Sequence, residues 1–585
     1  MARRRFQIAL IKPSHYDDEG YVIQWRRSTI PSNSLASVYG LIADCAERQI
    51  LGEDVEIAID AWDECNTVID VAGVVRSIKA ASGFIGLVGV QSNQFPRALD
   101  LTRRFRAAGV PVVIGGFHVS GCLAMLPELT PELREAQNLG AILYAGECEG
   151  RMDELLRDID RGEPKPLYNV LHDLPGMEAA VVPILPRRVV QRVSGHYASF
   201  DAGRGCPFQC SFCTIINVQG RKSRYRTADD VEAIVRANAA IGITRFFVTD
   251  DNFARNRNWE AILDRLIELR ERHGFQIRLL LQVDTLCHKT PDFIEKAARA
   301  GCNAVFIGLE NINPQSLAGA KKRQNKIWEY REMLQAWRAQ RVMTWAGYIL
   351  GFPGDTAESI ARDIETIKRE LPIDILEFFC LTPLPGSEDH KRLHLQGVAM
   401  DPDMNKYDLE HVTTAHPVMS EDEWRRVYRD AWRRYYTDSH VETVLRRAAR
   451  DGLNPKKVAD ALTVFSGAMR IEAVHPLQFG FVRRKRRGER RHGMTLENPL
   501  IFYPRRAVEF VAVLAAWMRL LRRYRRIMRR VLTDPAQAAY SDEALRGGEG
   551  ETAALPDFVR AFSDKIPRTY GAPVTAADAT ADAAD

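Results

Sequence analysis

Cysteine is scarce in this sequence, with ten among 585 residues, and apolar runs are short. No run reaches the ~20 residues that a membrane-spanning helix needs. The apolar stretch at 8–11 is also too short for a secretory signal peptide. We therefore expect a cytoplasmic protein. In that compartment a tight group of cysteines is more often a metal or catalytic site than a disulfide framework.

The length and the residue pattern indicate several α/β domains, because a single core stops growing at about 250–300 residues. Residues 1–168 alternate β-branched runs with helical patterns, and strands are expected at 7–11, 55–60, 84–90, 112–114 and 141–144. Such alternation predicts a doubly wound, Rossmann-like parallel sheet that binds its ligand at the carboxyl ends of the strands. The proline-rich residues 169–196 are expected to form a linker.

A second series of alternating strands and helices occupies residues 197–415, with strands expected at 245–249, 278–283, 304–308, 344–350 and 375–381. This series predicts a partial or full (β/α) barrel. Residues 416–535 are expected to be helical, with helices at 421–436, 440–449 and 506–532. Residues 536–585, rich in alanine and acidic residues, are expected to be a disordered tail.

Three cysteines, Cys206, Cys210 and Cys213, lie within eight residues of the stretch GRGCPFQCSFC. A zinc knuckle would need a fourth ligand close by, but the next cysteine is Cys287 and the nearest downstream histidine is His273. Three thiolates on one loop can instead hold an iron–sulfur cubane and leave its fourth iron open for a substrate or cosubstrate.

The Arg-Gly-Cys-Pro lead-in and the phenylalanine before the third cysteine resemble the signature of the radical SAM enzymes. The resemblance implies a [4Fe-4S] cluster on the three cysteines, with S-adenosylmethionine chelated at the open iron and cleaved to a 5'-deoxyadenosyl radical. It assigns no catalytic acid or base. It implies SAM contacts at the following residues, most of them at the ends of the next strands: Phe212, Asp250, Asp251, Gln282, Glu310 and Gly351. A carboxylate at a strand end can also simply cap the next helix.

The N-terminal domain resembles the cobalamin-binding domain of the B12-dependent radical SAM enzymes. The resemblance implies cobalamin contacts where strands end, at Gln91, Ser92, Asn93, Gly115, Gly116, His118, Gly146 and Glu147. The Asp-x-His-x-x-Gly motif, which supplies a cobalt ligand in several B12 proteins, is absent from the sequence. We therefore expect His118 to form a hydrogen bond near the edge of the ligand rather than to bind cobalt.

The methylthiotransferases offer an alternative for this domain, since their flavodoxin-like head holds a second cluster on three cysteines. Here Cys45, Cys65, Cys122 and Cys148 are scattered, and none ends the first strand as that pattern requires. Cys45 and Cys122 lie among apolar residues and are expected in the core.

The region 483–530 is strongly basic although the formal charge of the whole chain is only +5. Apolar residues recur at helical spacing at 520, 521, 524, 527, 528 and 531, with arginines between them. This pattern favours an amphipathic helix that, with the basic cluster before it, contacts the surface of an anionic membrane through residues 481–532. The alternative is a helix packed on the barrel with a solvated arginine face. Nucleic acid is not expected as a partner because no reading module is recognisable.

Together these features predict a cobalamin-dependent radical SAM enzyme that methylates an unactivated carbon of a hydrophobic small molecule, such as a lipid, terpenoid or tetrapyrrole. It would take electrons from a donor such as flavodoxin or ferredoxin, and would be cytoplasmic or peripheral on the inner face of the membrane. Three alternatives remain open: a cyclase or oxidase that uses the same cofactors without methyl transfer, a methylthiotransferase, and a non-catalytic cobalamin sensor.

Overall fold

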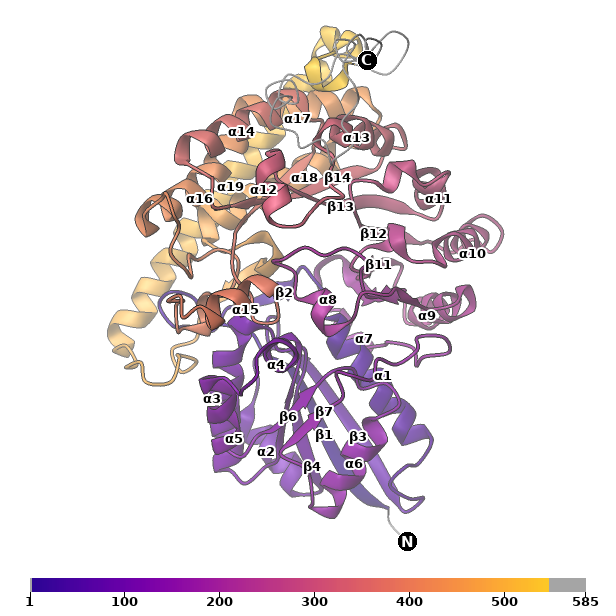
Figure 1. The fold of residues 1–585 in the computed structure, drawn as a ribbon, viewed down its shortest axis with the longest axis vertical. Coiled ribbons are helices and arrows are strands. Elements are labelled where there is room, and N and C mark those ends of the chain that lie inside the picture. Colours follow the sequence, from indigo (N-terminus) through magenta and orange to yellow (C-terminus); the bar gives the residue numbers. More distant parts are fainter. Residues whose placement is uncertain (1–2, 547–585) are drawn as a thin grey trace, which may run out of the picture.

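The computed structural model describes residues 3–546, and its N-terminal part is built on a six-stranded parallel sheet (Figure 1). The strand order is β3-β1-β4-β5-β6-β7, and every neighbouring pair is parallel. The strands are β1 (Arg4–Lys12), β3 (Val55–Asp63), β4 (Ser82–Leu87), β5 (Val112–Gly115), β6 (Ile142–Ala145) and β7 (Leu167–Asn169). The predicted doubly wound sheet is confirmed, and its five predicted strands lie at or near the expected residues.

Helices cover both faces of this sheet, so successive residues of β1 point into two different hydrophobic cores. Ile8 and Leu10 lie in one core and Ala9 and Ile11 in another. The helices are α1 (Asn33–Glu47), α2 (Val71–Lys79), α3 (Phe95–Ala107), α4 (Phe117–Met125), α5 (Pro131–Asn138) and α6 (Met152–Arg161). β3 and β4 lie on opposite sides of β1, so the strand order reverses there. At such a switch point the strand ends leave a crevice for a ligand.

The second sheet is also six-stranded and parallel, in the order β15-β14-β13-β12-β11-β8. Its strands are β8 (Tyr197–Phe200), β11 (Arg245–Val248), β12 (Arg278–Val283), β13 (Cys302–Glu310), β14 (Met343–Leu350) and β15 (Ile375–Cys380). Within residues 3–546 the edge strands β8 and β15 do not pair with each other, so the barrel is partial. The connecting helices are α9 (Ala228–Ala240), α10 (Trp259–Glu271), α11 (Phe293–Arg299), α12 (Pro314–Gly319), α13 (Tyr330–Ala339) and α14 (Ala357–Glu370).

The C-terminal helices pack on the barrel and also reach the N-terminal part. They are α16 (Glu421–Tyr435), α17 (Asp438–Arg450), α18 (Pro455–Gly467) and α19 (Pro499–Thr533). The short strand β2 (Gln24–Ser28) pairs antiparallel with β16 (Gly480–Arg484), a pairing between distant segments that the sequence did not indicate. Arg97 on α3 also binds the carboxylate of Glu489 at 2.7 Å. The C-terminal region therefore connects the two sheets.

The predicted disordered tail differs from the structure over 536–546. Two 3-10 turns, Pro535–Ala539 and Glu543–Leu545, cover this stretch. They are held in place because Arg447 donates to Asp542 at 2.7 Å and Gln335 donates to the carbonyl of Ala544 at 3.0 Å. The rest of the predicted tail, 547–585, lies outside the described residues.

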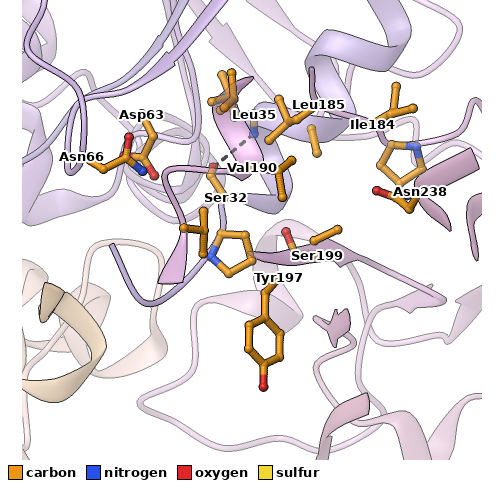
Figure 2. Close-up of a pocket in the computed structure, with 16 residues that line it drawn as sticks. Ser32, Leu35, Asp63, Asn66, Ile184, Leu185, Val190, Tyr197, Ser199 and Asn238 are labelled. Atoms are coloured by element: carbon orange, nitrogen blue, oxygen red, sulfur yellow. Dashed lines mark hydrogen bonds between the residues drawn. The ribbon is translucent and has the colours of Figure 1, made fainter. Parts of the chain in front are cut away.

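The segment predicted as a linker packs closely between the two sheets. After residues without regular structure it forms the short helix α7 (Arg187–Val190). Figure 2 shows Leu185 and Val190 from this segment beside Leu35 of α1 and Ser199 of β8. These residues line a cavity of about 10 Å³. The dashed line in that view is the cap of α1, in which Ser32 accepts a hydrogen bond from the Leu35 amide at 3.2 Å. The segment therefore packs against both the N-terminal domain and the first strand of the barrel.

Candidate functional site

The three clustered cysteines lie on the loop between β9 (Gly203–Arg204) and the short helix α8 (Ile215–Val218). Backbone hydrogen bonds shape the loop: the amide of Cys206 donates to Gly220 at 3.2 Å, and that of Cys213 donates to Cys210 at 3.2 Å. Burial raises the pKa of the Cys206 thiol to about 11 and that of the Cys213 thiol to about 12. Thiols in such surroundings become thiolates when a metal coordinates them, and none of the three is in a disulfide. The donor set therefore fits an iron–sulfur cluster.

A buried lysine lies beside this loop. Lys322 forms an ion pair with Glu310 at the end of β13, and its ammonium lies 5.7 Å from the centre of the Phe212 ring. Although burial opposes it, the charges of Glu310 and of the thiols at 210 and 213 raise the pKa of Lys322. Lys322 is therefore positioned to offset the negative charge of a thiolate-bound cluster. It also engages Glu310, so a SAM contact by Glu310 remains a prediction.

Asp250 and Asp251 follow β11 but point to different places. Asp250 is 2% exposed and accepts hydrogen bonds from the Ala202 amide at 2.6 Å and from Asn256 at 3.0 Å. Asp251 accepts from the Gly205 amide at 3.2 Å, directly before the cysteine loop. Burial raises the pKa of both carboxyl groups to about 7, and for Asp251 the charge of Asp250 adds to the effect. Asp250 therefore supports the loops, whereas Asp251 is available to a ligand.

The largest cavity that these residues reach lies between the two domains and has a volume of about 530 Å³. Asp251 and Gln282 contribute to its wall from the barrel, and Gln91, Ser92 and Asn93 contribute from the N-terminal domain. The C-terminal region adds Leu477 and His475. All three parts of the chain therefore enclose one space next to the cysteine loop.

A second cavity of about 170 Å³ lies over the strand ends of the N-terminal sheet, and Arg204, Val218 and Gln219 of the barrel complete its wall. The predicted cobalamin contacts Gly115, Gly116, Gly146 and Glu147 line it. It shares Asn33, Ser34, Gly89, Phe117, Arg204 and Gln219 with the wall of the larger cavity. The Oδ1 atom of Asn33 and Oγ of Ser37, both from its lining residues, are buried and lack hydrogen-bond partners among residues 3–546. Polar groups without partners, next to apolar walls, fit a large ligand with many amide groups such as cobalamin.

Some predicted contact residues have clear structural roles. Gly116 has φ of +148°, and a Cβ atom there would lie 2.2 Å from the amide nitrogen of Val90. Gly351 has φ of +99°, and its Cβ would lie 1.9 Å from the ring of Trp424. Gly351 lines neither of the two cavities. Both glycines are required by close packing of the chain itself, and their ligand contacts remain predictions.

His118 does not line either cavity. It is fully buried on α4, its Nδ1 lies 3.1 Å from Ser92 Oγ, and its Nε2 lies 3.2 Å from a carboxylate oxygen of Glu132. Its ring therefore does not reach either cavity directly, but it contacts Ser92, which lines the larger one. A hydrogen bond from His118 to cobalamin remains a prediction.

Sequence reasoning did not predict the ion pairs that connect the domains at this site, although it named Glu147 as a cobalamin contact. Glu147 and Glu149 bind the guanidinium of Arg204, and Glu147 also binds Arg224. Lys322 and Gln324, whose amide nitrogen lies 3.4 Å from Cys210 Sγ, were also missed. The local signal for Lys322 is the basic run Lys321-Lys322-Arg323, and this run does not indicate which of its lysines is buried.

These observations define a two-domain α/β protein in which a three-cysteine loop at a partial barrel faces a doubly wound domain across a shared cavity. Residues 202–367, which include the three cysteines, match the family model described as the Radical SAM superfamily. The predicted resemblance is confirmed.

The chain is similar in sequence to two curated methyltransferases. It is 26% identical to the hopanoid C-2 methylase of Rhodopseudomonas palustris (strain TIE-1) over 301 residues, which are 51% of this chain and 55% of that protein. It is 26% identical to the bacteriochlorophyllide d C-8(2)-methyltransferase of Chlorobaculum tepidum over 352 residues, covering 56% of this chain and 73% of that protein. The match therefore spans about half of the hopanoid enzyme and about three quarters of the other.

A solved structure shares the fold. It is TsrM from Kitasatospora setae, a radical S-adenosylmethionine methyltransferase with cobalamin and a [4Fe-4S] cluster bound. The TM-score is 0.51 at 16% identity, and the match covers 68% of this chain and 79% of TsrM. At that identity the likeness confirms the α/β fold class.

Proposed function

We propose that this protein is a cobalamin-dependent radical SAM methyltransferase that acts on an unactivated carbon of a hydrophobic small molecule. The observation that carries the proposal is the common wall of the two cavities. The residues expected to hold cobalamin and those beside the cysteine loop meet around one space of about 530 Å³. The two curated relatives are, by their names, a hopanoid methylase and a bacteriochlorophyllide methyltransferase, and both names denote carbon methylation of small molecules.

Each part of the chain has a defined task in this proposal. Cys206, Cys210 and Cys213 hold the cluster, and Asp251 and Gln282 line the space expected for SAM. Gln91 and the glycine-rich strand ends of the N-terminal domain hold cobalamin. When bound, these cofactors supply one-electron chemistry and a transferable methyl group. The walls from both domains exclude water and stray hydrogen donors from the reacting carbon.

The test uses the full chain, purified anaerobically, reconstituted with iron, sulfide and cobalamin, and reduced in the presence of methyl-labelled SAM. We expect iron and cobalt in the protein, formation of 5'-deoxyadenosine, and label in the cobalamin fraction. Formation of 5'-deoxyadenosine without label in that fraction would favour the cyclase or oxidase. Cobalamin binding without any SAM cleavage would favour the sensor.

We infer further that the protein contacts the surface of an anionic membrane through the first half of α19. The exposed large apolar residues of that half are Leu500, Ile501, Tyr503, Val508, Phe510, Val511, Leu514 and Met518. Large exposed apolar patches on soluble domains mark interaction sites. Arg519 is exposed at the end of this patch and suits anionic headgroups, whereas Arg505 is paired with Glu497 at 2.6 Å. Among residues 3–546, no helix is both long and apolar enough to span a bilayer.

This assignment moves the membrane contact away from the residues that the sequence pattern favoured. Leu520, Tyr524, Ile527 and Val531 are buried against the C-terminal helices. The Tyr524 hydroxyl donates to Ser466 of α18 at 3.1 Å. Their helical spacing therefore reflects packing within the protein, and the expectation that their face binds the membrane was wrong.

Flotation with vesicles that contain phosphatidylserine tests the contact. Val508 and Val511 are 70% and 65% exposed, so changing both to aspartate should leave the fold intact. We expect the bound fraction to fall by about tenfold or more, since two apolar side chains no longer enter the lipid. The matched control is Val418→Asp, at a residue that is 58% exposed elsewhere on the surface. Equal flotation of both variants would contradict the contact.

A further inference from the structure

A histidine, a cysteine and a glutamate meet inside the N-terminal domain, away from the cysteine loop. One ligand atom each of His118, Cys122 and Glu132 lies within 4.8 Å of the other two. His118 and Cys122 are four residues apart on α4 and so share one face of that helix, while Glu132 belongs to the first turn of α5. His118 and Cys122 are 0% and 1% exposed. Imidazole, thiolate and carboxylate are the ligands that zinc takes in proteins.

The histidine and the glutamate are close without being aligned for a hydrogen bond. His118 Nε2 lies 3.2 Å from the Glu132 carboxylate, yet this buried nitrogen has no hydrogen-bond partner within the described chain. Ligands at about 2.0–2.3 Å from a tetrahedral ion stand roughly 3.5 Å from one another, and they point at the ion rather than at each other. The other ring nitrogen, Nδ1, lies 3.1 Å from Ser92 Oγ. A second hydrogen bond of this kind fixes the ring of a metal-binding histidine.

The candidate for a fourth ligand comes from the other domain and stands outside the group of three atoms that lie within 4.8 Å of one another. His390 on α15 (Glu388–Leu395) is 5% exposed, and its Nδ1 has no hydrogen-bond partner within the described chain. The segment that precedes α15 packs against α4. A Cβ atom on Gly121, which lies between the two α4 ligands, would stand 2.6 Å from the carbonyl oxygen of Pro385. Figure 1 shows α15 next to α4 at the junction of the two sheets.

We propose that His118, Cys122, Glu132 and His390 bind a structural zinc ion that fastens the N-terminal domain to the segment after β15. Four protein ligands close the coordination sphere, as is usual for structural zinc sites. Binding releases the Cys122 proton and leaves the thiolate on the ion. The site is separate from the cofactor cavities, but Ser92 connects it to the wall of the larger one. It would thereby set the position of the Gln91–Asn93 segment.

The test begins with a chain in which Cys206, Cys210 and Cys213 are all replaced by alanine, so that zinc cannot occupy the cysteine loop. After a wash with a chelator, elemental analysis should find about one zinc per chain. Adding Cys122→Ala should lower the content to less than about a tenth of that value. The matched control is Cys302→Ala, because Cys302 is also a buried cysteine and its thiol donates to the carbonyl of Ala304.

X-ray absorption at the zinc edge provides the second measurement, and it needs no further substitution. We expect one sulfur at about 2.3 Å and three nitrogen or oxygen ligands at about 2.0–2.2 Å. His390→Gln should remove one histidine from this spectrum. The proposal is overturned if the triple alanine chain holds no zinc, if its spectrum contains no sulfur, or if Cys122→Ala and His390→Gln both retain the wild-type content.

Discussion

Glu149 accepts a hydrogen bond at 2.7 Å from the guanidinium of Arg204, so the N-terminal domain holds the strand that leads into the cysteine loop. Glu147 binds the same guanidinium, and it also accepts from Arg224 at 2.5 Å on the neighbouring strand β10 (Arg224–Tyr225). These side chains are between 8% and 15% exposed. The position of the cluster relative to the cobalamin-binding domain is therefore fixed by ion pairs that cross the domain boundary.

Glu147→Ala should destabilise the protein. It leaves Arg224 without its carboxylate and Arg204 with two of its three acidic partners. Breaking a buried pair costs about 3–5 kcal/mol, and the remaining partners favour the lower end. Denaturant unfolding of the anaerobic protein measures the loss. Glu154→Ala, at an exposed pair with Lys165, should change the free energy of unfolding by no more than about 1 kcal/mol. Equal losses in both variants would show that the buried network contributes nothing special.

Alanine at Cys206, Cys210 or Cys213 should abolish SAM cleavage and remove the cluster iron. Each thiolate holds one of the three protein-bound irons, so the cluster loses a ligand that it needs. Cobalamin binding should be retained, since none of the three cysteines lines the cavity in the N-terminal domain. Iron content, cobalt content and 5'-deoxyadenosine formation are measured on the same samples. A variant that keeps its iron and cleaves SAM would rule out that cysteine as a ligand.

Gly351→Ala should destabilise the protein by about 2–4 kcal/mol. The new Cβ would overlap the ring of Trp424, and the φ of +99° is unfavourable for alanine. Gly354→Ala is the matched control in the same loop, since nothing lies within 4 Å of a Cβ placed there. Thermal unfolding distinguishes the two variants. If Gly351→Ala weakens SAM binding without a loss of stability, the glycine serves the ligand and not the packing.

The sequence predicted the elements that depend on local patterns, and it missed what depends on distant contacts. The strand at 278–283 was predicted with the bounds that it has, because its apolar residues and the following turn are contiguous. The pairing of β2 with β16 joins segments more than 450 residues apart, and no local signal marks it. In the same way, the cysteine spacing predicted the cluster ligands, whereas Lys322 is recognisable only once α12 brings it beside Glu310.

The arginine-rich half of α19 shows how a pattern can be real and still be assigned the wrong partner. Helical spacing of the apolar residues from Leu520 to Val531 correctly predicted one buried face. Spacing alone does not say whether lipid or protein covers that face, because both bury apolar side chains. The helices that cover this face, α17 and α18, precede α19 by more than 30 residues in the sequence, and α18 itself was not predicted.

Glu377 on β15 should make the stability fall as pH rises through the neutral range. Burial raises the pKa of its carboxyl group to about 8, above the ordinary 4.5 of an unfolded chain. Between these values the folded protein holds a proton that the unfolded chain has released. This contribution is therefore complete below about pH 4.5 and is lost as pH rises toward 8. Glutamine resembles the protonated carboxyl. The free energy of unfolding of Glu377→Gln, relative to that of the wild type, should therefore be higher at pH 8 than at pH 5.

The neighbouring His475 also makes the free energy of unfolding depend on pH. Its Nε2 lies 3.9 Å from the Glu377 carboxylate, and burial lowers the pKa of the imidazole to about 3. A histidine that stays neutral when folded makes stability rise with pH between about 3 and 6.5, opposite in sign to the carboxyl group. Denaturant unfolding of Glu377→Gln and of the wild type at pH 5, 6.5 and 8 separates the two effects, because the histidine is present in both. A difference between the proteins that does not grow with pH would mean that Glu377 is ionised in the folded state.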